Sequence, residues 1–271
     1  MKIGVFDSGL GGLTILRQLL NKLPQYSYIY LGDNARVPYG NRSGELIYGF
    51  TEQAVDFLLK KNCQLVIIAC NTSTTTSLRK IQHEYLPSHY PGRRVLGVVK
   101  PVVEEITVGK HGRIGVIGTK ATVNSEAFVR EIKKVLPNSE VFQQACPLLV
   151  PFIEDGAKNN KILNLVLREY LGDLLKRNID TLILACTHYE LLKKEIGELV
   201  GSKIKVISEG KIIAKKLKEY LDNHKDIEKK LEKRGRREFY VTDLTPDYDR
   251  LMELFLGSHW KAGKLQLISL K

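Results

Sequence analysis

Short apolar runs alternate with longer stretches of helical period along most of this chain. Runs of this kind are typical of parallel strands that helices cover on both faces. The runs predict strands over residues 2–6, 27–31, 65–69, 95–98, 113–117, 140–143, 181–185 and 205–207, with a later strand near 238–241. The longer stretches predict helices over residues 13–23, 45–61, 72–85, 124–135, 160–177 and 212–221. The pattern therefore indicates an α/β fold with largely parallel sheets.

Small and polar residues directly follow three of the predicted strands. The three junctions are Asp7-Ser8-Gly9, Cys70-Asn71-Thr72 and Cys186-Thr187-His188. In an open α/β sheet, ligands bind at the loops that follow the carboxyl ends of the strands. Backbone N–H groups at the start of the next helix favour an anion at the same place. Each junction is therefore a candidate part of a ligand site.

The second and third junctions resemble each other, because in both an apolar strand is followed by Ala-Cys and then by a nearby threonine. Their cysteines, Cys70 and Cys186, are separated by about the length of one domain. This repetition predicts two similar α/β domains that face each other across a cleft, each contributing one cysteine. We expect the first domain to be discontinuous, formed by residues 1–97 and 208–271, with residues 98–207 as the second domain.

Length and charge narrow the class of protein. With 271 residues the chain can bury a substantial core, which excludes disordered, collagen-like and mini-protein classes. Its 42 Lys and Arg residues against 30 Asp and Glu residues give a net charge of +12, which favours nucleic acid, phosphate or small acidic ligands. Basic residues concentrate at 225–237, without a zinc-finger spacing or an aromatic RNA-binding motif beside them. We interpret this segment as the solvated end of a helix and a loop.

Cysteine usage and hydropathy predict the compartment. The four cysteines form no CxxC pair, and the N-terminus lacks the layout of a signal peptide. The longest apolar runs have the length of strands, well short of the roughly 20 residues of a membrane span. We therefore expect a cytoplasmic protein with free thiols and no membrane segment.

The loop after the first predicted strand is rich in glycine, but its spacing does not match nucleotide-binding loops. A GxGxxG motif that begins at Gly9 needs a small residue at position 14, which is Thr14. A GxxxxGK[ST] phosphate loop is also absent. Two interpretations of the polar residues in this loop remain open. Asp7 holds an ammonium group or orients a neighbouring acid or base, or else Asp7 and Ser8 cap the following helix.

Cys70 and Cys186 are the strongest chemical candidates, because each follows a buried strand and precedes a helix. The helix dipole and the free N–H groups predict a thiol pKa below about 8.5, which makes the thiol usable as a base or nucleophile. The candidate roles are a Cys186–His188 nucleophile, a zinc site, and a symmetric pair of thiols that transfers protons from opposite faces. Only the thiol pair uses both cysteines, and a further metal ligand at a convincing spacing is absent.

Further motifs occur in order along nearly the whole chain. They are Phe6-Asp7-Ser8-Gly9 with Gly11-Gly12, Gly32-Asp33 with Arg36-Val37-Pro38-Tyr39-Gly40, Ala69-Cys70-Asn71-Thr72, Gly118-Thr119-Lys120-Ala121-Thr122, Cys146-Pro147-Leu148, Pro151 with Glu154, and Cys186-Thr187-His188-Tyr189. Any one of these motifs is weak, but together they are highly specific. In this combination the chain resembles the glutamate racemases, cofactor-independent members of the aspartate/glutamate racemase family that supply D-glutamate for peptidoglycan.

The resemblance implies that Cys70 and Cys186 are the acid and the base, with the α-carbon of the substrate between them. One thiolate removes the α-proton and the other thiol protonates the opposite face, so that neither a cofactor nor a metal is required. The family pattern also places Asp7 near Cys70 and His188 near Cys186 as helpers. Glu154 is expected to support His188.

The resemblance further implies a set of substrate contacts. Their hydroxyl, amide and backbone N–H groups suit the two carboxylates of glutamate and offset the charge that develops at the weakly acidic α-carbon. The residues are Asp7, Ser8, Tyr39, Gly40, Asn71, Thr72, Thr187 and His188, with Thr119 and Thr122 as further candidates. For Tyr39, packing of the turn and contact with the substrate both remain open.

Two positions depart from the family pattern. Lys100-Pro101 carries a base where an acidic or apolar residue often precedes the proline. Ser208-Glu209-Gly210 replaces a more usual Asp-Ser/Pro-Ala/Gly run. Neither position is predicted to be catalytic.

The predicted function is interconversion of L- and D-glutamate by a homodimer. One alternative is an aspartate or other acidic amino-acid racemase of the same superfamily, because pocket depth decides a difference of one methylene. The Asp7-Ser8-Gly9 and Pro38-Tyr39-Gly40 motifs favour glutamate. An alternative of another class is a basic nucleic-acid-binding protein on the same scaffold, which predicts steeply salt-dependent binding that does not need the cysteines.

Overall fold

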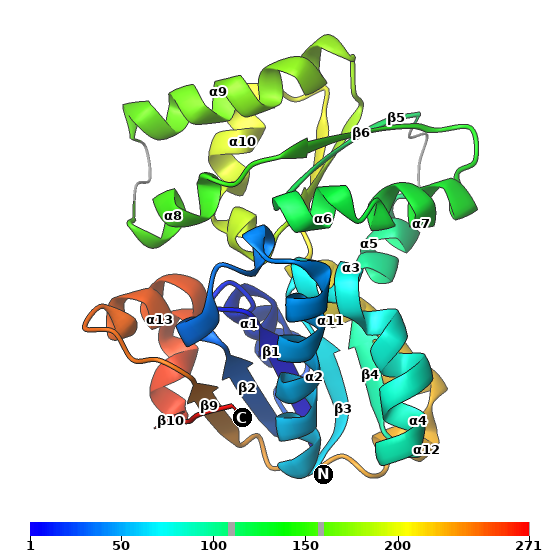
Figure 1. The fold of residues 1–271 in the computed structure, drawn as a ribbon, viewed down its shortest axis with the longest axis vertical. Helices are drawn as coiled ribbons and strands as arrows, with labels where there is room; N and C mark the ends of the chain where they lie inside the picture. Colours follow the sequence, from blue (N-terminus) through cyan, green and yellow to red (C-terminus); the bar gives the residue numbers. More distant parts are fainter. Residues whose placement is uncertain (108–111, 157–159, 271) are drawn as a thin grey trace.

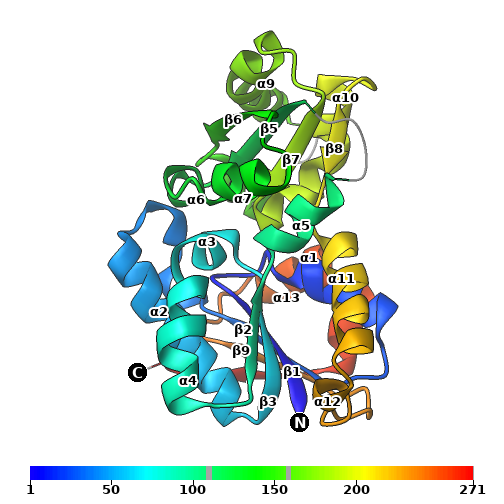
Figure 2. The ribbon, with the colours of Figure 1, turned by 90° about the vertical axis from the view of Figure 1, so that its right-hand side faces the viewer.

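The computed structural model describes residues 1–107, 112–156 and 160–270 of the chain. These residues form two lobes, one above the other in both views (Figure 1 and Figure 2), each built on an all-parallel sheet. We call them the six-stranded lobe and the four-stranded lobe after their sheets. The predicted α/β class with parallel sheets is confirmed.

The six-stranded sheet combines strands from both ends of the chain. In spatial order its strands are β10 (Lys264–Leu267), β9 (Arg237–Val241), β2 (Tyr28–Gly32), β1 (Lys2–Asp7), β3 (Cys63–Ile68) and β4 (Arg94–Gly97). One face is covered by α1 (Leu13–Lys22), α11 (Gly210–Asn223) and α13 (Tyr248–Leu256). The other face is covered by α2 (Gly44–Lys60), α3 (Asn71–Lys80) and α4 (Leu86–His89).

The four-stranded sheet comes from the middle of the chain. In spatial order its strands are β6 (Glu140–Ala145), β5 (Arg113–Gly118), β7 (Thr181–Ala185) and β8 (Lys205–Ile207). Its helices are α5 (Val99–Glu105) and α7 (Ala127–Val135) on one face, with α8 (Leu149–Glu154), α9 (Lys161–Lys176) and α10 (Lys193–Val200) on the other. Helix α6 (Lys120–Asn124) packs against α3 and therefore joins the two lobes.

Strand residues alternate between two apolar clusters, which explains why the apolar runs are unbroken. In β1, Ile3 and Val5 pack with α1 and α11, whereas Phe6 packs on the side of α2. In β7, Ile183 packs on the side of α5 and α7, whereas Leu184 packs with α9. Successive side chains of a strand point to opposite faces, so a strand covered on both sides needs apolar residues throughout.

Every predicted strand is present, but several elements were not predicted. The predicted helix over residues 124–135 is interrupted, because Glu126 takes a left-handed conformation (φ 51°) between α6 and α7. The helix predicted over residues 72–85 is present as α3 and a π-helical turn, Ile81–Tyr85. The unpredicted elements include the short helices α4, α5, α6, α8 and α10, the C-terminal helix α13 and the edge strand β10. Apart from α13, these elements are too short for a clear periodicity.

The basic segment at residues 225–237 forms a short helix, α12 (Lys225–Glu228), and a loop, as predicted. Several of its bases pair with nearby acids: Lys233 lies 2.6 Å from Glu228, and Arg236 lies 3.7 Å from Glu232. These pairs neutralise part of the local positive charge. Within the described ranges, no helix is both long enough and apolar enough to cross a membrane.

Substitution of Phe128 tests the packing of the four-stranded lobe. Its ring is fully buried in the cluster beneath α7, so Phe128→Ala should lower the free energy of unfolding by about 3–5 kcal/mol. Leu165 on α9 is 67% exposed, and Leu165→Ala should change that free energy by less than about 0.5 kcal/mol. Urea unfolding measures both values. Equal losses in the two variants would contradict the described core.

Candidate active site

A cavity of about 250 Å³ lies where the carboxyl ends of strands from the two sheets face each other. It is smaller than the roughly 300–1,000 Å³ of pockets for drug-sized ligands, and therefore suits a small molecule. Its lining includes Ser8, Tyr39, Gly40, Cys70, Asn71 and Thr72 from the six-stranded lobe, and Thr119, Cys146, Glu154, Cys186, Thr187 and His188 from the four-stranded lobe. The fold thus brings together the three junctions that the sequence separates.

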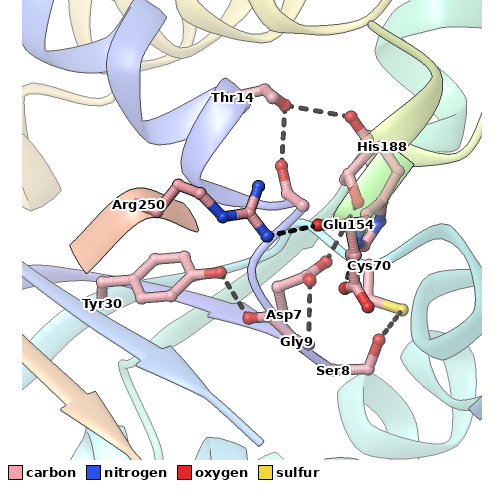
Figure 3. A network of polar contacts seen from close by, with 11 residues as sticks. Asp7, Ser8, Gly9, Thr14, Tyr30, Cys70, Glu154, His188 and Arg250 are labelled. Carbon is pink, nitrogen blue, oxygen red and sulfur yellow. Dashed lines mark hydrogen bonds and ion pairs between the residues drawn. The ribbon is translucent and has the colours of Figure 1, made fainter. Parts of the chain in front are cut away.

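Cys70 lies at the N-cap position of α3, directly after β3. Its Sγ atom is 3.3 Å from the hydroxyl of Ser8 (Figure 3). Burial raises the pKa of the Cys70 thiol and the neighbouring Asp7 carboxylate raises it further, while Ser8 and the backbone N–H of Ser73 act in the opposite direction. The prediction that the helix lowers this pKa is wrong here, because desolvation outweighs the N–H groups.

Asp7 lies beneath Cys70 and Ser8 rather than in the cavity lining, and only 1% of it is exposed. Its Oδ2 atom accepts from the backbone N–H of Gly9 at 3.0 Å, and its Oδ1 atom accepts from the hydroxyl of Thr187 at 3.4 Å. The second bond connects the two lobes. Burial raises the pKa of the Asp7 carboxyl, whereas nearby His188 favours the charged form.

Neither Asp7 nor Ser8 is the N-cap residue of α1, although the Asp7 carboxylate accepts from the backbone N–H of Gly12. Helix α1 begins at Leu13, and its N-cap residue is Gly12. The side chain of Ser8 contacts Cys70 instead, and that of Asp7 bonds to its own loop and to the other lobe. Both residues therefore belong to the polar network of the site (Figure 3).

Cys186 lies opposite, at the start of a 3-10 turn, Thr187–Leu192, that follows β7. Burial raises the pKa of its thiol well above the ordinary value, and the backbone N–H of His188 only partly offsets this. The Nε2 atom of His188 is 3.0 Å from Oε1 of Glu154, which confirms the expected proximity of these two residues. A carboxylate at one ring nitrogen fixes the orientation of the imidazole.

Helix α13 supports the pair of His188 and Glu154, and sequence reasoning missed it. Phe255 meets the ring of His188 edge-on, with centroids 5.2 Å apart. Arg250 donates to the backbone carbonyl of Glu154 at 2.9 Å (Figure 3). The available signal was the amphipathic stretch over residues 248–256, whose buried positions recur with helical period.

The side chain of Tyr39 is engaged in contacts within its own lobe. Its hydroxyl donates to the buried Asp33, which also accepts from Arg36 at 2.6 Å. The ring packs beside Phe50, with centroids 5.4 Å apart. Packing of the turn is therefore the role of the Tyr39 side chain, and the adjoining backbone remains available at the cavity.

Three threonines connect the lobes at one side of the cavity. Thr72 Oγ1 lies 2.8 Å from Thr119 Oγ1, which lies 3.0 Å from Thr122 Oγ1. Gly40 lies against Thr119, so closely that a Cβ atom at position 40 would come within 2.7 Å of the Thr119 Cβ. Thr119 also caps α6 by accepting from the backbone N–H of Thr122 at 3.1 Å. These contacts place hydroxyl groups from both lobes beside the cavity.

The arrangement is suited to proton transfer to and from a small substrate in the cavity. Three cysteines line the cavity. Cys146 donates to the backbone carbonyl of Gln144 at 3.7 Å, whereas Cys70 and Cys186 come from different sheets and each has a carboxylate or imidazole nearby. All four cysteines are buried, and their thiols are free, as predicted. Among the described residues, no group of three His, Cys, Asp or Glu side chains is arranged to hold a metal ion.

Comparison with known proteins identifies the family of this site. The family model described as Asp/Glu/hydantoin racemase matches residues 9–217. The chain belongs to this family. It is 37% identical to the glutamate racemase of Geobacter metallireducens, over 99% of this chain and 97% of that one. It is 41% identical to the glutamate racemase of Aquifex aeolicus, over 95% and 94% of the two chains.

A solved structure agrees with these sequence relatives. The glutamate racemase of Francisella tularensis, crystallised in complex with D-glutamate, superposes with a TM-score of 0.89 at 35% identity. The match covers 100% of this chain and 98% of that chain. The predicted resemblance is therefore confirmed, and the activity of the protein is that of an amino-acid isomerase that interconverts L- and D-glutamate.

Substitution of Gly11 tests the contact between the lobes at the site. A Cβ atom at this position would overlap the ring of His188 and the hydroxyl of Thr187. Gly11→Ala should therefore lower kcat/KM by about 100-fold, because a displacement of roughly 1 Å at a site of proton transfer has this effect. Gly49→Ala is the control, since nothing lies within 4 Å of a Cβ there. Steady-state kinetics measure kcat/KM of both variants. Unchanged activity in Gly11→Ala would contradict the described packing.

Proposed function

We propose that the protein interconverts the glutamate enantiomers by proton transfer between Cys70 and Cys186. The observation that carries this proposal is that the two thiols come from different sheets and line the same small cavity. Inversion at a carbon needs a base on one face and an acid on the other. Two lobes that each contribute a thiol supply this pair.

The proposed step conserves one proton and one electron pair. The thiolate of one cysteine takes the α-proton, and the electron pair of the broken C–H bond stays on the substrate as a carbanion conjugated with the α-carboxylate. The thiol of the other cysteine then delivers its proton to the opposite face. The two cysteines have exchanged protonation states, and exchange with solvent resets them.

Substrate binding relies on donors at both ends of the molecule. Hydroxyl, amide and backbone N–H groups around the cavity face the carboxylates and stabilise the charge that develops in the transition state. We assign this role to Ser8, Tyr39, Gly40, Asn71, Thr72, Thr187 and His188, with the Tyr39 and Asn71 contacts made through the backbone. Thr119 belongs to the same lining, whereas Asp7 lies beneath it.

Helper groups remove and return the thiol protons. Asp7 serves Cys70, whose pKa it raises through its charge, and His188 with Glu154 serves Cys186. Burial keeps both thiols neutral until a positive charge arrives. Of the substrate's groups only the α-ammonium favours a thiolate beside it, whereas both carboxylates oppose one. Neither a metal nor an organic cofactor takes part in the proposed step.

Several broader properties are proposed from the resemblance to the glutamate racemases. We propose a cytoplasmic homodimer that supplies D-glutamate for peptidoglycan. We also propose the division into domains of residues 1–97 with 208–271 and of residues 98–207. In its support, the strands of the six-stranded sheet all lie in the first set and those of the four-stranded sheet in the second.

Removal of either thiol should stop racemisation. Cys70→Ala and Cys186→Ala should each lower kcat by at least about 10²–10⁴-fold, the usual contribution of one acid or base. Circular dichroism of glutamate measures the rate in both directions. Cys63→Ala is a matched control, because Cys63 is also buried but lies at the start of β3, outside the cavity lining.

Two outcomes of this experiment decide the proposal. Loss of activity in Cys70→Ala and Cys186→Ala, with an active Cys63→Ala variant, supports the two-thiol mechanism. Racemisation at the wild-type rate in either of the first two variants would refute it. Assays with L- and D-aspartate under the same conditions check the selectivity for glutamate.

The pH dependence of kcat/KM should report the buried thiols. Burial raises the pKa of Cys70 and of Cys186 above the ordinary value of 9.0. The reaction needs one thiolate, and kcat/KM reflects ionisation of the free enzyme. The value of kcat/KM should therefore still rise with pH at pH 9.0. A profile that is already flat at neutral pH would show that a thiol is ionised there, contrary to the described burial.

A further inference from the structure

Glu209 is a buried acid that the proposed mechanism does not use. It follows β8 at the point where the chain returns from the four-stranded to the six-stranded lobe, and it is the N-cap residue of α11. Only 3% of the residue is exposed. Carboxyl groups are rarely buried to this extent without a partner or a function.

The carboxyl group of Glu209 makes one hydrogen bond within the described part of the chain. Its Oε2 atom accepts from Nδ2 of Asn71 at 2.8 Å, and Oε1 has no hydrogen-bond partner among the described residues. The backbone around Glu209 is firmly held. Its carbonyl accepts from the N–H of Ile213 at 2.9 Å, and the next residue, Gly210, lies against Gln18 of α1. The carboxyl group is therefore presented to Asn71 from a fixed point.

Asn71 connects this contact with the cavity. It is the first residue of α3, next to Cys70, and its side chain is 2% exposed and belongs to the cavity lining. Because Nδ2 is engaged by Glu209, the remaining polar atom of the amide is Oδ1. Within the described part of the chain, Oδ1 has no hydrogen-bond partner. A buried amide oxygen without a partner is unfavourable unless a ligand donates to it.

We propose that Glu209 is a positioning residue that fixes the Asn71 amide, so that its oxygen receives the α-ammonium of glutamate. The ammonium is the only hydrogen-bond donor of the substrate at neutral pH, because both carboxylates accept. An amide turned the other way would present Nδ2 to this cation and repel it. This inference rests on the proposed function, since it assigns one contact within that same substrate site.

The surroundings of Glu209 favour the neutral, protonated form of its carboxyl group. Burial raises its pKa well above the ordinary value, and the charges of Glu190 and Asp7 raise it further, while the hydrogen bond from Asn71 acts in the opposite direction. A neutral acid still accepts through its carbonyl oxygen. A glutamine at position 209 offers an acceptor of the same shape, so it should fulfil the same role.

The test compares two ligands that differ only in the ammonium group. D-Glutamate is the substrate, and glutarate, which carries both carboxylates but no amine, is the probe whose competition with D-glutamate is measured. Glu209→Met keeps the volume and removes the acceptor, and it should raise KM for D-glutamate about tenfold, as expected for one lost buried hydrogen-bonding partner. The inhibition constant of glutarate should not change. Glu209→Gln should keep both constants at the wild-type values.

Glu190→Gln is the matched control. Glu190 lines the same small crevice as Glu209 beside Cys186, but its carboxylate makes no bond to Asn71 in the described structure. Both constants should stay at the wild-type values in this variant. Thermal unfolding of every variant verifies that it is folded, and Glu209→Ala replaces Glu209→Met if the latter does not fold.

Each remaining outcome overturns the inference. Equal weakening of glutamate and glutarate in Glu209→Met would show a general structural role, as would failure of both the Met and Ala variants to fold. An unchanged KM would show that Glu209 does not orient Asn71. A KM in Glu209→Gln as high as in Glu209→Met would show that charge rather than an acceptor is required. Failure of the proposed function is distinguishable, because then the wild-type protein or its cysteine dependence would fail the assay.

Discussion

Desolvation at the carboxyl ends of β1, β3 and β7 is the constraint on which the rest of the site depends. Asp7, Cys70 and Cys186 are all almost completely buried, and burial raises the pKa of each. In such surroundings charge is expensive unless a partner is close. The same low dielectric strengthens every interaction with a charged substrate that enters.

The parallel arrangement of both sheets brings these buried groups to one cavity. In parallel sheets, the carboxyl ends of neighbouring strands meet at one edge, where loops rather than apolar side chains end each strand. Two such edges enclose the cavity. Polar contacts join the lobes beside it: Thr187 reaches Asp7 at 3.4 Å, and Thr72 reaches Thr119 at 2.8 Å. One apolar cluster also spans both lobes and includes Cys186. Small changes at the polar contacts are expected to act on catalysis, because these contacts lie directly beside the cavity.

Much of this architecture could be predicted from the chain. Strands that are buried on both faces appear in the sequence as unbroken apolar runs, such as residues 65–69 and 181–185. The Ala-Cys pairs that follow these two runs indicated both thiols. The direction of the thiol pKa shift was not predictable, because it depends on how much protein surrounds each sulfur atom. The partners of His188 were only partly predictable. Glu154 followed from the family resemblance, but Phe255 and Arg250 come from a helix near the other end of the chain.

The contact between Glu209 and Asn71 shows the same limit. These residues are far apart in sequence, and only the return of the chain through α11 brings them within 2.8 Å. Sequence comparison marked Glu209 as a departure without giving it a role. A role can be assigned to a polar residue that departs from the family pattern only when its neighbours and its burial are known.

The central claim is that two different thiols act on opposite faces of one carbon. The most direct measurement starts from D-glutamate in D2O and stops the reaction early. The L-glutamate formed should carry one deuterium, because its new proton comes from a thiol that has exchanged with solvent. The remaining D-glutamate should still carry its original hydrogen. Deuterium entering the D-glutamate as fast as L-glutamate forms, or the original hydrogen retained in the product, would indicate a single base and contradict the account.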